Sequence, residues 1–201
     1  MLMNPDEKKI EAFKNIVIES SSNPDFIHHA WFVEYHLNIV ERIAKELLQH
    51  YPEANSSLVR ILVWLHDYGK SVDFSNQYIT TLTEGRKQLK KLDFDNDFID
   101  TIIEYMDIMD KKLELDITKA PIEVQIVSSA DGCSHFIGPF MQLWWWENAH
   151  KDYKELMDDN KAKAIKDWTR KIVLPEARNM IGPRYTFILE QSGDLPDKFL
   201  S

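Results

Sequence analysis

His66 and Asp67 are the residues of this chain that are best placed to do chemistry. They end a nearly all-apolar segment at 58–65 and are followed by Gly69 and Lys70. An imidazole and a carboxylate at the end of a buried element need a partner, because burying polar groups without one is costly. The residues themselves leave two partners open, a hydrogen-bond network or a metal ion.

Two more residues are candidates for the same centre. His36 lies beside an apolar stripe of an amphipathic helical pattern, and Asp131 lies among small residues that follow the apolar run 122–127. A single ion at the end of segment 58–65 could be reached by His66 and Asp67 together. Its remaining ligands would come from other helices, and His36 and Asp131 are the natural candidates.

Helical patterns dominate the elements that must position these residues. The apolar run 58–65 could be a buried strand or a buried helix, and we predict a helix because its neighbours are helical and hairpin turn signals are missing. The chain also has only 6 Gly and 8 Pro, few for an all-β protein. We therefore predict an all-α single domain of seven or more helices. The expected helices are 5–20, 25–50, 58–65, 78–92, 96–111, 120–138, 139–158 and 161–180, with a polar loop after Gly69 and an irregular tail after Pro183.

Composition and charge narrow the class of protein. A length of 201 residues favours one domain over residues 1–201. The net charge of −9 disfavours binding to duplex nucleic acid, which needs a basic face. The single cysteine, Cys133, excludes an intramolecular disulfide, and no signal peptide or membrane span is found. We expect a cytoplasmic protein that does not bind membranes.

Three segments in this order resemble the HD-domain superfamily of metal-dependent phosphohydrolases. They are 35–40 with His36, 62–70 with His66 and Asp67, and 126–131 with Asp131. The resemblance covers about 25–137, and the C-terminal helices at about 139–201 are expected to pack on that core. It implies that these four residues bind one divalent metal ion, with Mn, Fe, Co, Ni, Zn and Mg left open. No histidine lies between His66 and His135, which puts a two-metal site in doubt.

The same resemblance implies hydrolysis of a phosphate ester of a small molecule, with a nucleotide as the expected substrate. The general base stays open among Asp67, Asp73, Glu84 and Glu104, and we favour Asp67, acting through its free oxygen. We also assign a catalytic role to Lys70, which the Gly69 turn would bring beside the metal. The residues expected to bind the phosphorylated substrate are Lys70, His29, Arg86 and His135. His29 precedes His36 by seven residues, and His135 follows Asp131 by four, which places each pair on one helical face.

Two other functions stay open. Some family members have a glutamate where Lys70 stands here, which favours a catalytically weak or inactive metal- or nucleotide-binding module of the same fold. The second is a plain helical protein in which the His and Asp residues form a buried network. The oligomeric state is also open, because the apolar tail around Phe187 could cover the body of the chain or a partner in a homodimer.

Overall fold

The computed structural model describes residues 5–112 and 114–198, and within these residues the chain is all helical, without a β-strand. This confirms the predicted fold class. The main helices are α1 (Glu7–Ser21), α2 (Asn38–Leu48), α3 (Ser56–Leu65), α4 (Tyr68–Val72), α5 (Gln77–Lys91), α6 (Asn96–Asp110), α7 (Ile122–Ser134), α8 (Phe140–Glu147), α9 (Tyr153–Lys166) and α10 (Pro175–Gln191). In the part of the chain described, no helix combines the length and the apolar character needed to cross a bilayer.

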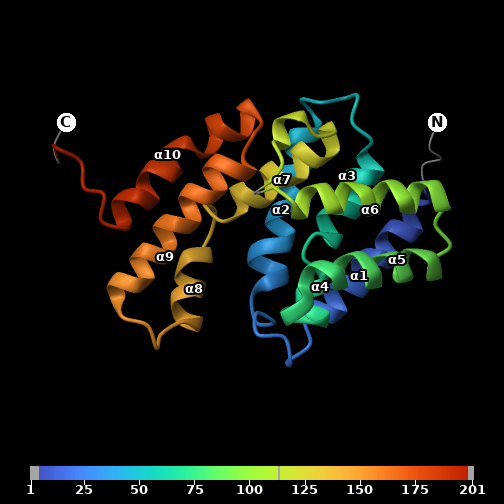
Figure 1. Ribbon diagram of the computed structural model, residues 1–201, viewed down its shortest axis with the longest axis horizontal. Helices are drawn as coiled ribbons and strands as arrows, with labels where there is room; N and C mark the ends of the chain where they lie inside the picture. The colour runs from blue at the N-terminus through green and yellow to red at the C-terminus, as the bar shows by residue number, and fades with distance from the viewer. Residues whose placement is uncertain (1–4, 113, 199–201) are drawn as a thin grey trace.

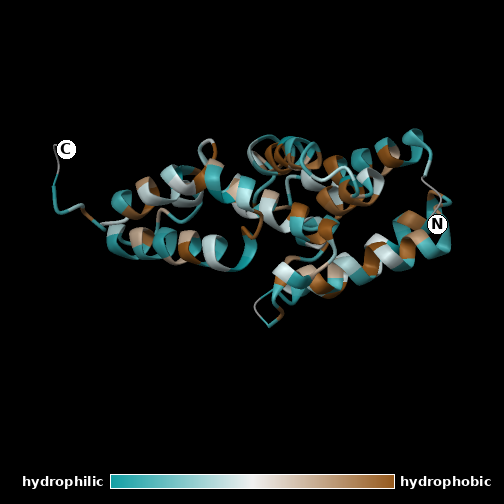
Figure 2. Cartoon of the chain, turned by 90° about the horizontal axis from the view of Figure 1, so that it is seen from above, coloured by the Kyte–Doolittle hydropathy of each residue, from teal (hydrophilic) through white to brown (hydrophobic). Residues whose placement is uncertain are grey.

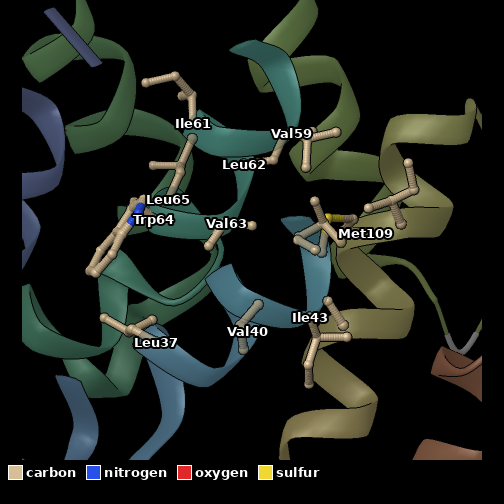
Figure 3. Packing of buried hydrophobic residues seen from close by; sticks show 14 of the residues in the cluster. Leu37, Val40, Ile43, Val59, Ile61, Leu62, Val63, Trp64, Leu65 and Met109 are labelled. Atoms are coloured by element: carbon tan, nitrogen blue, oxygen red, sulfur yellow. The ribbon is translucent and has the colours of Figure 1, made fainter. Parts of the chain in front are cut away.

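Helix α3 lies at the centre of the fold. Asn55 caps it by accepting hydrogen bonds from the N–H groups of Ser57 and Leu58, and its apolar side chains are buried on every side. A helix that is apolar all round must be enclosed by other elements, and here α1, α2, α6 and α7 surround it. Figure 3 shows side chains of α2 and α6, such as Val40 and Met109, meeting those of α3. The position of the polar end of α3 is therefore set by the four helices packed around it.

Two parts can be distinguished along the chain. Helices α1–α7 form what we call the body, and α8–α10 with the π turn Asp167–Lys171 form what we call the extension, which projects from α7 (Figure 1). The two parts share one apolar core, because Ile172 and Ile181 are buried together with residues of α7. Apolar residues gather between the helices of both parts (Figure 2). The predicted division into a core at 25–137 and packed C-terminal helices stays a prediction.

A single glycine allows the extension to approach the body closely. A Cβ on Gly132 of α7 would lie 2.7 Å from Ile172 Cγ1 and 3.0 Å from Lys171 Cβ. Contacts this short exclude any larger residue unless the π turn moves away from α7. Gly132 therefore sets how near Lys171 comes to α7.

The predicted helix 25–50 is wrong in its first third. Residues 24–31 form turns, with i→i+3 hydrogen bonds such as His29 N–H to Phe26 O, and the helix begins with a π turn at Val33–Leu37 that continues into α2. In these turns His28 and Trp31 both reach Glu147 of α8: His28 Nδ1 lies 2.7 Å from one carboxylate oxygen, and Trp31 Nε1–H donates to the other at 2.6 Å. Tertiary contacts with the extension therefore override the helical pattern.

The expected boundaries after Gly69 and in the C-terminal third also need correction. The polar loop begins with a short helix, α4, and helix 139–158 is interrupted after Glu147. Asp152 then begins α9 with a capping box. The tail after Pro183 is helical to the end of α10, because Pro183 lies on the exposed face, where water can bond the carbonyl that its missing N–H leaves unpaired.

Candidate metal centre

Four donor atoms from three parts of the chain converge at the end of α3. His36 Nε2 lies 3.2 Å from His66 Nε2 and 3.3 Å from Asp67 Oδ2, and His66 Nε2 lies 3.6 Å from that oxygen. Asp131 Oδ1 lies 3.9 Å from His36 Nε2 and 3.8 Å from His66 Nε2. Ligands at about 2.1 Å from one ion are about 3.0–3.4 Å apart in octahedral or tetrahedral geometry. Donors at 3.2–3.9 Å need only a small contraction to hold an ion, and they form two groups of three that share His36, one with His66 and Asp67 and one with Asp131 and His135.

The local backbone explains how neighbouring residues face one centre. His66 is the last residue with helical dihedrals, and Asp67 leaves the helix with φ −121° and ψ 11°. In a continuous helix their side chains would diverge by about 100°. His36 belongs to the π turn Val33–Leu37, a type of distortion that is frequent at functional sites. The helix end and the π turn thus aim side chains that regular helices would separate.

Hydrogen bonds on the far side of both imidazoles fix their tautomers. His66 Nδ1 lies 2.7 Å from Val63 O, which can only accept, so Nδ1 carries the proton. Ser134 donates its hydroxyl proton to Asp131 O at 2.7 Å and therefore accepts from His36 Nδ1 at 3.0 Å. Both Nε2 atoms then present lone pairs to each other at 3.2 Å. Facing lone pairs repel, and a cation between them satisfies both, so the residues present fit a divalent metal ion.

The protonation states of the centre suit metal binding. Burial lowers the pKa of His36 to about 4, so its imidazole is neutral at pH 7. Burial would raise the pKa of Asp131, but Lys171 and the nearby histidines outweigh it and hold that pKa well below the usual value. The same balance, with Lys70 and His66 as the opposing charges, lowers the pKa of Asp67. Neutral imidazoles and ionised carboxylates are the forms that bind metals.

Each carboxylate of the centre also pairs with a lysine. Lys70, in α4, has its Nζ 2.6 Å from Asp67 Oδ2, the same oxygen that faces the imidazoles. Lys171 Nζ lies 2.6 Å from Asp131 Oδ2, which leaves Oδ1 of that residue directed at the imidazoles. Lys171 is only 8% exposed, and it comes from the extension. The centre is therefore completed by a residue that lies far along the chain from the motif.

His135 also lies at the centre. Its ring stacks on that of His36 with centroids 5.2 Å apart, and its Nε2 lies 3.6 Å from Asp131 Oδ1. On the other side, Nδ1 lies 2.8 Å from Oδ2 of Asp167, which is fully buried in the π turn of the extension. Burial, together with the nearby Lys163, lowers the pKa of His135 to about 3. A neutral His135 can thus contact either the metal or a ligand beside it.

Two predicted substrate-binding residues lie elsewhere. His29 is exposed, and its Nδ1 lies near Phe26 O rather than in the cavity, because the turns at 24–31 replace the expected helical face. Its neighbour His28 lines the cavity instead. Arg86 forms an ion pair with Asp100 at the surface of α5 and α6, away from the centre. Neither His29 nor Arg86 is proposed further as a substrate ligand.

A cavity of about 470 Å³ opens over the centre between the body and the extension. Most of its charged wall was not predicted from the sequence; this wall includes Asp110, Lys112, Lys163, Lys166 and Lys171. One signal was available: Lys163, Asp167 and Lys171 recur at intervals of four, as residues on one helical face do. No pattern indicated that this face would meet α7.

Of three comparisons with known proteins, the one with protein-family models agrees with this geometry. A search of the curated proteins and of the solved structures found no match. The family model for the HD domain matches residues 33–135, just over half of the chain. The matched segment begins at the π turn with His36 and ends at His135, so it spans the four converging donors. The chain therefore belongs to the HD domain family.

Proposed function

We propose that this protein is a metal-dependent phosphohydrolase that cleaves a phosphate ester of a small molecule, with a nucleotide as substrate. The observation that carries the proposal is that the carboxylates of Asp67 and Asp131 both face the paired imidazoles of His36 and His66, in a cavity whose wall contains lysines. The mixed nitrogen and oxygen donors suit Mn, Fe, Co, Ni, Zn or Mg. A divalent ion bound there supplies Lewis-acid chemistry, since it polarises a phosphoryl oxygen and lowers the pKa of a water.

The chain's own residues bind and orient the reacting groups. Asp67 is the most exposed of the four donors, at 14%, and so is best placed to accept a hydrogen bond from the attacking water. Its lowered pKa makes it a weak proton acceptor, so we assign it to orienting the water. Lys70, which is 28% exposed beside it, and Lys112 in the same wall balance the negative charge of the phosphate.

Aromatic residues at the cavity favour a nucleotide over a simple sugar phosphate. Phe74 and Tyr78 from the body and Trp144 from the extension line the cavity. Phe74 and Tyr78 are 47% and 60% exposed, so part of each ring is accessible to a ligand. Aromatic faces stack on nucleobases of any sequence. A phosphate at the metal and a base between these residues would fill the cavity.

The test combines metal content with turnover. Protein purified without chelator is measured by elemental analysis as wild type, His66→Ala and His29→Ala, the last being the matched control because His29 is an exposed histidine outside the cavity. We expect about one metal ion per chain in the wild type and the control, and its loss in His66→Ala. The wild type and control are expected to release phosphate from nucleoside monophosphates, whereas His66→Ala is not.

Two results would redirect the proposal. Stoichiometric metal without turnover of any phosphate ester would identify the alternative, a metal- or nucleotide-binding module of the same fold. Wild-type protein that takes up no metal even after incubation with Mn²⁺ or Ni²⁺ would contradict both functions. The four residues would then form a buried polar network in a helical protein.

A further inference from the structure

Asp110 differs from every other carboxylate in the cavity wall. The wall contains Asp67, Asp110, Asp131 and Asp159. Three of them form ion pairs at 2.5–2.6 Å: Asp67 with Lys70, Asp131 with Lys171, and Asp159 with Lys151. Among the described residues, Asp110 has no ion-pair partner. The lysines beside Asp67 and Asp131 hold these two carboxylates ionised, whereas no ion pair among the described residues does so for Asp110.

The environment of Asp110 favours its protonated form. One of its oxygens, Oδ2, is buried and has no hydrogen-bond partner in the described part of the chain. A buried ionised carboxylate without partners is strongly disfavoured. Burial, with the like charges of Asp67 and Asp107, outweighs Lys112 and Lys70 and raises the pKa of Asp110 to about 7. A carboxyl in this range can both hold and release a proton at neutral pH.

The position of Asp110 suits a group that acts on the substrate. It is the last residue of α6, and it lines the same cavity as His66 and Asp67. It makes no hydrogen bond or ion pair with the four metal donors within the described residues. It is therefore available to a molecule in the cavity without disturbing the centre.

We propose that Asp110 is the general acid of this site and donates its proton to the leaving oxygen of an alkyl phosphate ester. The inference rests on the proposed phosphohydrolase function and narrows its substrate class. As the oxygen of water forms the new P–O bond, the ester P–O bond breaks and its electron pair stays on the leaving oxygen, which takes the proton of Asp110. The attacking water loses one proton to solvent, and Asp110 regains one from solvent, so one water is consumed per ester.

The proposal implies a dependence on the leaving group. A sugar alkoxide is strongly basic and leaves only with a proton, whereas p-nitrophenolate is stable without one. We therefore compare metal-loaded wild type, Asp110→Asn and Asp110→Glu on a nucleoside 5′-monophosphate and on p-nitrophenyl phosphate. Asp100→Asn is the matched control, because Asp100 lies on the same helix, is 63% exposed and pairs with Arg86 at the surface.

Asp110→Asn should lower kcat/KM for the nucleotide by about 10²–10⁴-fold, the range of general acid catalysis, and leave p-nitrophenyl phosphate nearly unaffected. Asp110→Glu should recover most of the nucleotide activity, and Asp100→Asn should match the wild type on both esters. In the wild type, the rate with the nucleotide should fall as pH rises through the pKa of the acid, because the proton is then lost. That alkaline decline should be absent with p-nitrophenyl phosphate.

Several outcomes overturn the proposal. Equal losses on both esters in Asp110→Asn would indicate a structural role, and unchanged activity on the nucleotide would exclude any role in proton transfer. If Asp110→Asn does not fold, the wild type alone decides: a steep fall of kcat/KM with leaving-group basicity over a series of aryl and alkyl phosphates contradicts general acid catalysis, and a shallow one supports it. Wild-type protein that cleaves neither ester refutes the proposed function itself, and the acid with it.

Discussion

Replacing Lys171 by methionine tests how the extension supports the metal centre. Lys171 Nζ lies 2.6 Å from Asp131 Oδ2 and 3.4 Å from Asp167 Oδ1, and the side chains of the three residues are 8%, 5% and 0% exposed. Methionine has a similar length and fills the space without the charge. Asp131 would then lose the main cation that outweighs its burial, whereas Asp167 would keep Lys163 at 2.6 Å. The variant therefore tests the effect of removing the charge of Lys171 while its volume is kept.

The expected loss of stability follows from the burial of the pair. Removing one partner of a buried ion pair costs about 3–5 kcal/mol, because the other charge is left uncompensated. For a chain of this length, 1 kcal/mol corresponds to about 2–4 °C in Tm, so the metal-free variant should melt about 6–20 °C below the wild type. A divalent ion at the centre compensates Asp131 in place of the lysine. The deficit should therefore be smaller in the metal-loaded protein.

The assay is urea unfolding followed by circular dichroism, on protein treated with chelator and on the same protein reloaded with Mn²⁺. Lys161→Met is the control, because Lys161 pairs with Asp194 at the surface, where the two side chains are 36% and 46% exposed. Such pairs contribute about 0–1 kcal/mol. The double variant Lys171→Met with Asp131→Asn removes the stranded carboxylate and should be more stable than Lys171→Met alone.

If Lys171→Met loses no more stability than Lys161→Met in the metal-free protein, Lys171 does not stabilise Asp131 as argued. The same conclusion follows if Asp131→Asn adds a further loss to Lys171→Met. An equal deficit with and without Mn²⁺ would show that the lysine and the metal do not act on the same carboxylate.

Three further predictions concern the scaffold. Gly132→Ala should destabilise the protein by about 1–3 kcal/mol in thermal melts, because its Cβ would press on the π turn. Gly182→Ala is the control: the nearest atom to its Cβ lies at 3.8 Å, so this variant should be more stable by about 0.4–1 kcal/mol. Tyr51 donates a hydrogen bond to Glu176 at 2.5 Å, and this bond lowers the pKa of Glu176. The loss of stability in Tyr51→Phe should therefore be constant above pH 4.5. It should shrink as the pH falls through the lowered pKa of Glu176, because the carboxylate is then protonated. Burial raises the pKa of the Cys133 thiol, so a thiol reagent should modify Cys133 only after unfolding in urea, and rapid labelling of the native protein would contradict its burial.

Most of the helices could be predicted because their signals are local. The apolar periodicity of α2 and the caps of α3 and α6 depend on residues close together in the chain. The errors occur where contacts distant in the chain decide the backbone. At 24–31, Glu147 holds His28 and Trp31 in turns, and a helical pattern cannot reveal such a contact.

The metal centre shows the same contrast between local signals and contacts that are distant in the chain. The candidates His36, His66, Asp67 and Asp131 could be named from the sequence, because polar groups at the ends and faces of apolar helices need partners when buried and because their order resembles the HD-domain superfamily. Only the tertiary structure decided what surrounds them: Lys171, Asp167 and Lys163 reach the centre because Gly132 lets the π turn approach α7. The charge and protonation of a site depend on every group within a few ångströms, and proximity between segments forty residues apart arises only when the chain folds.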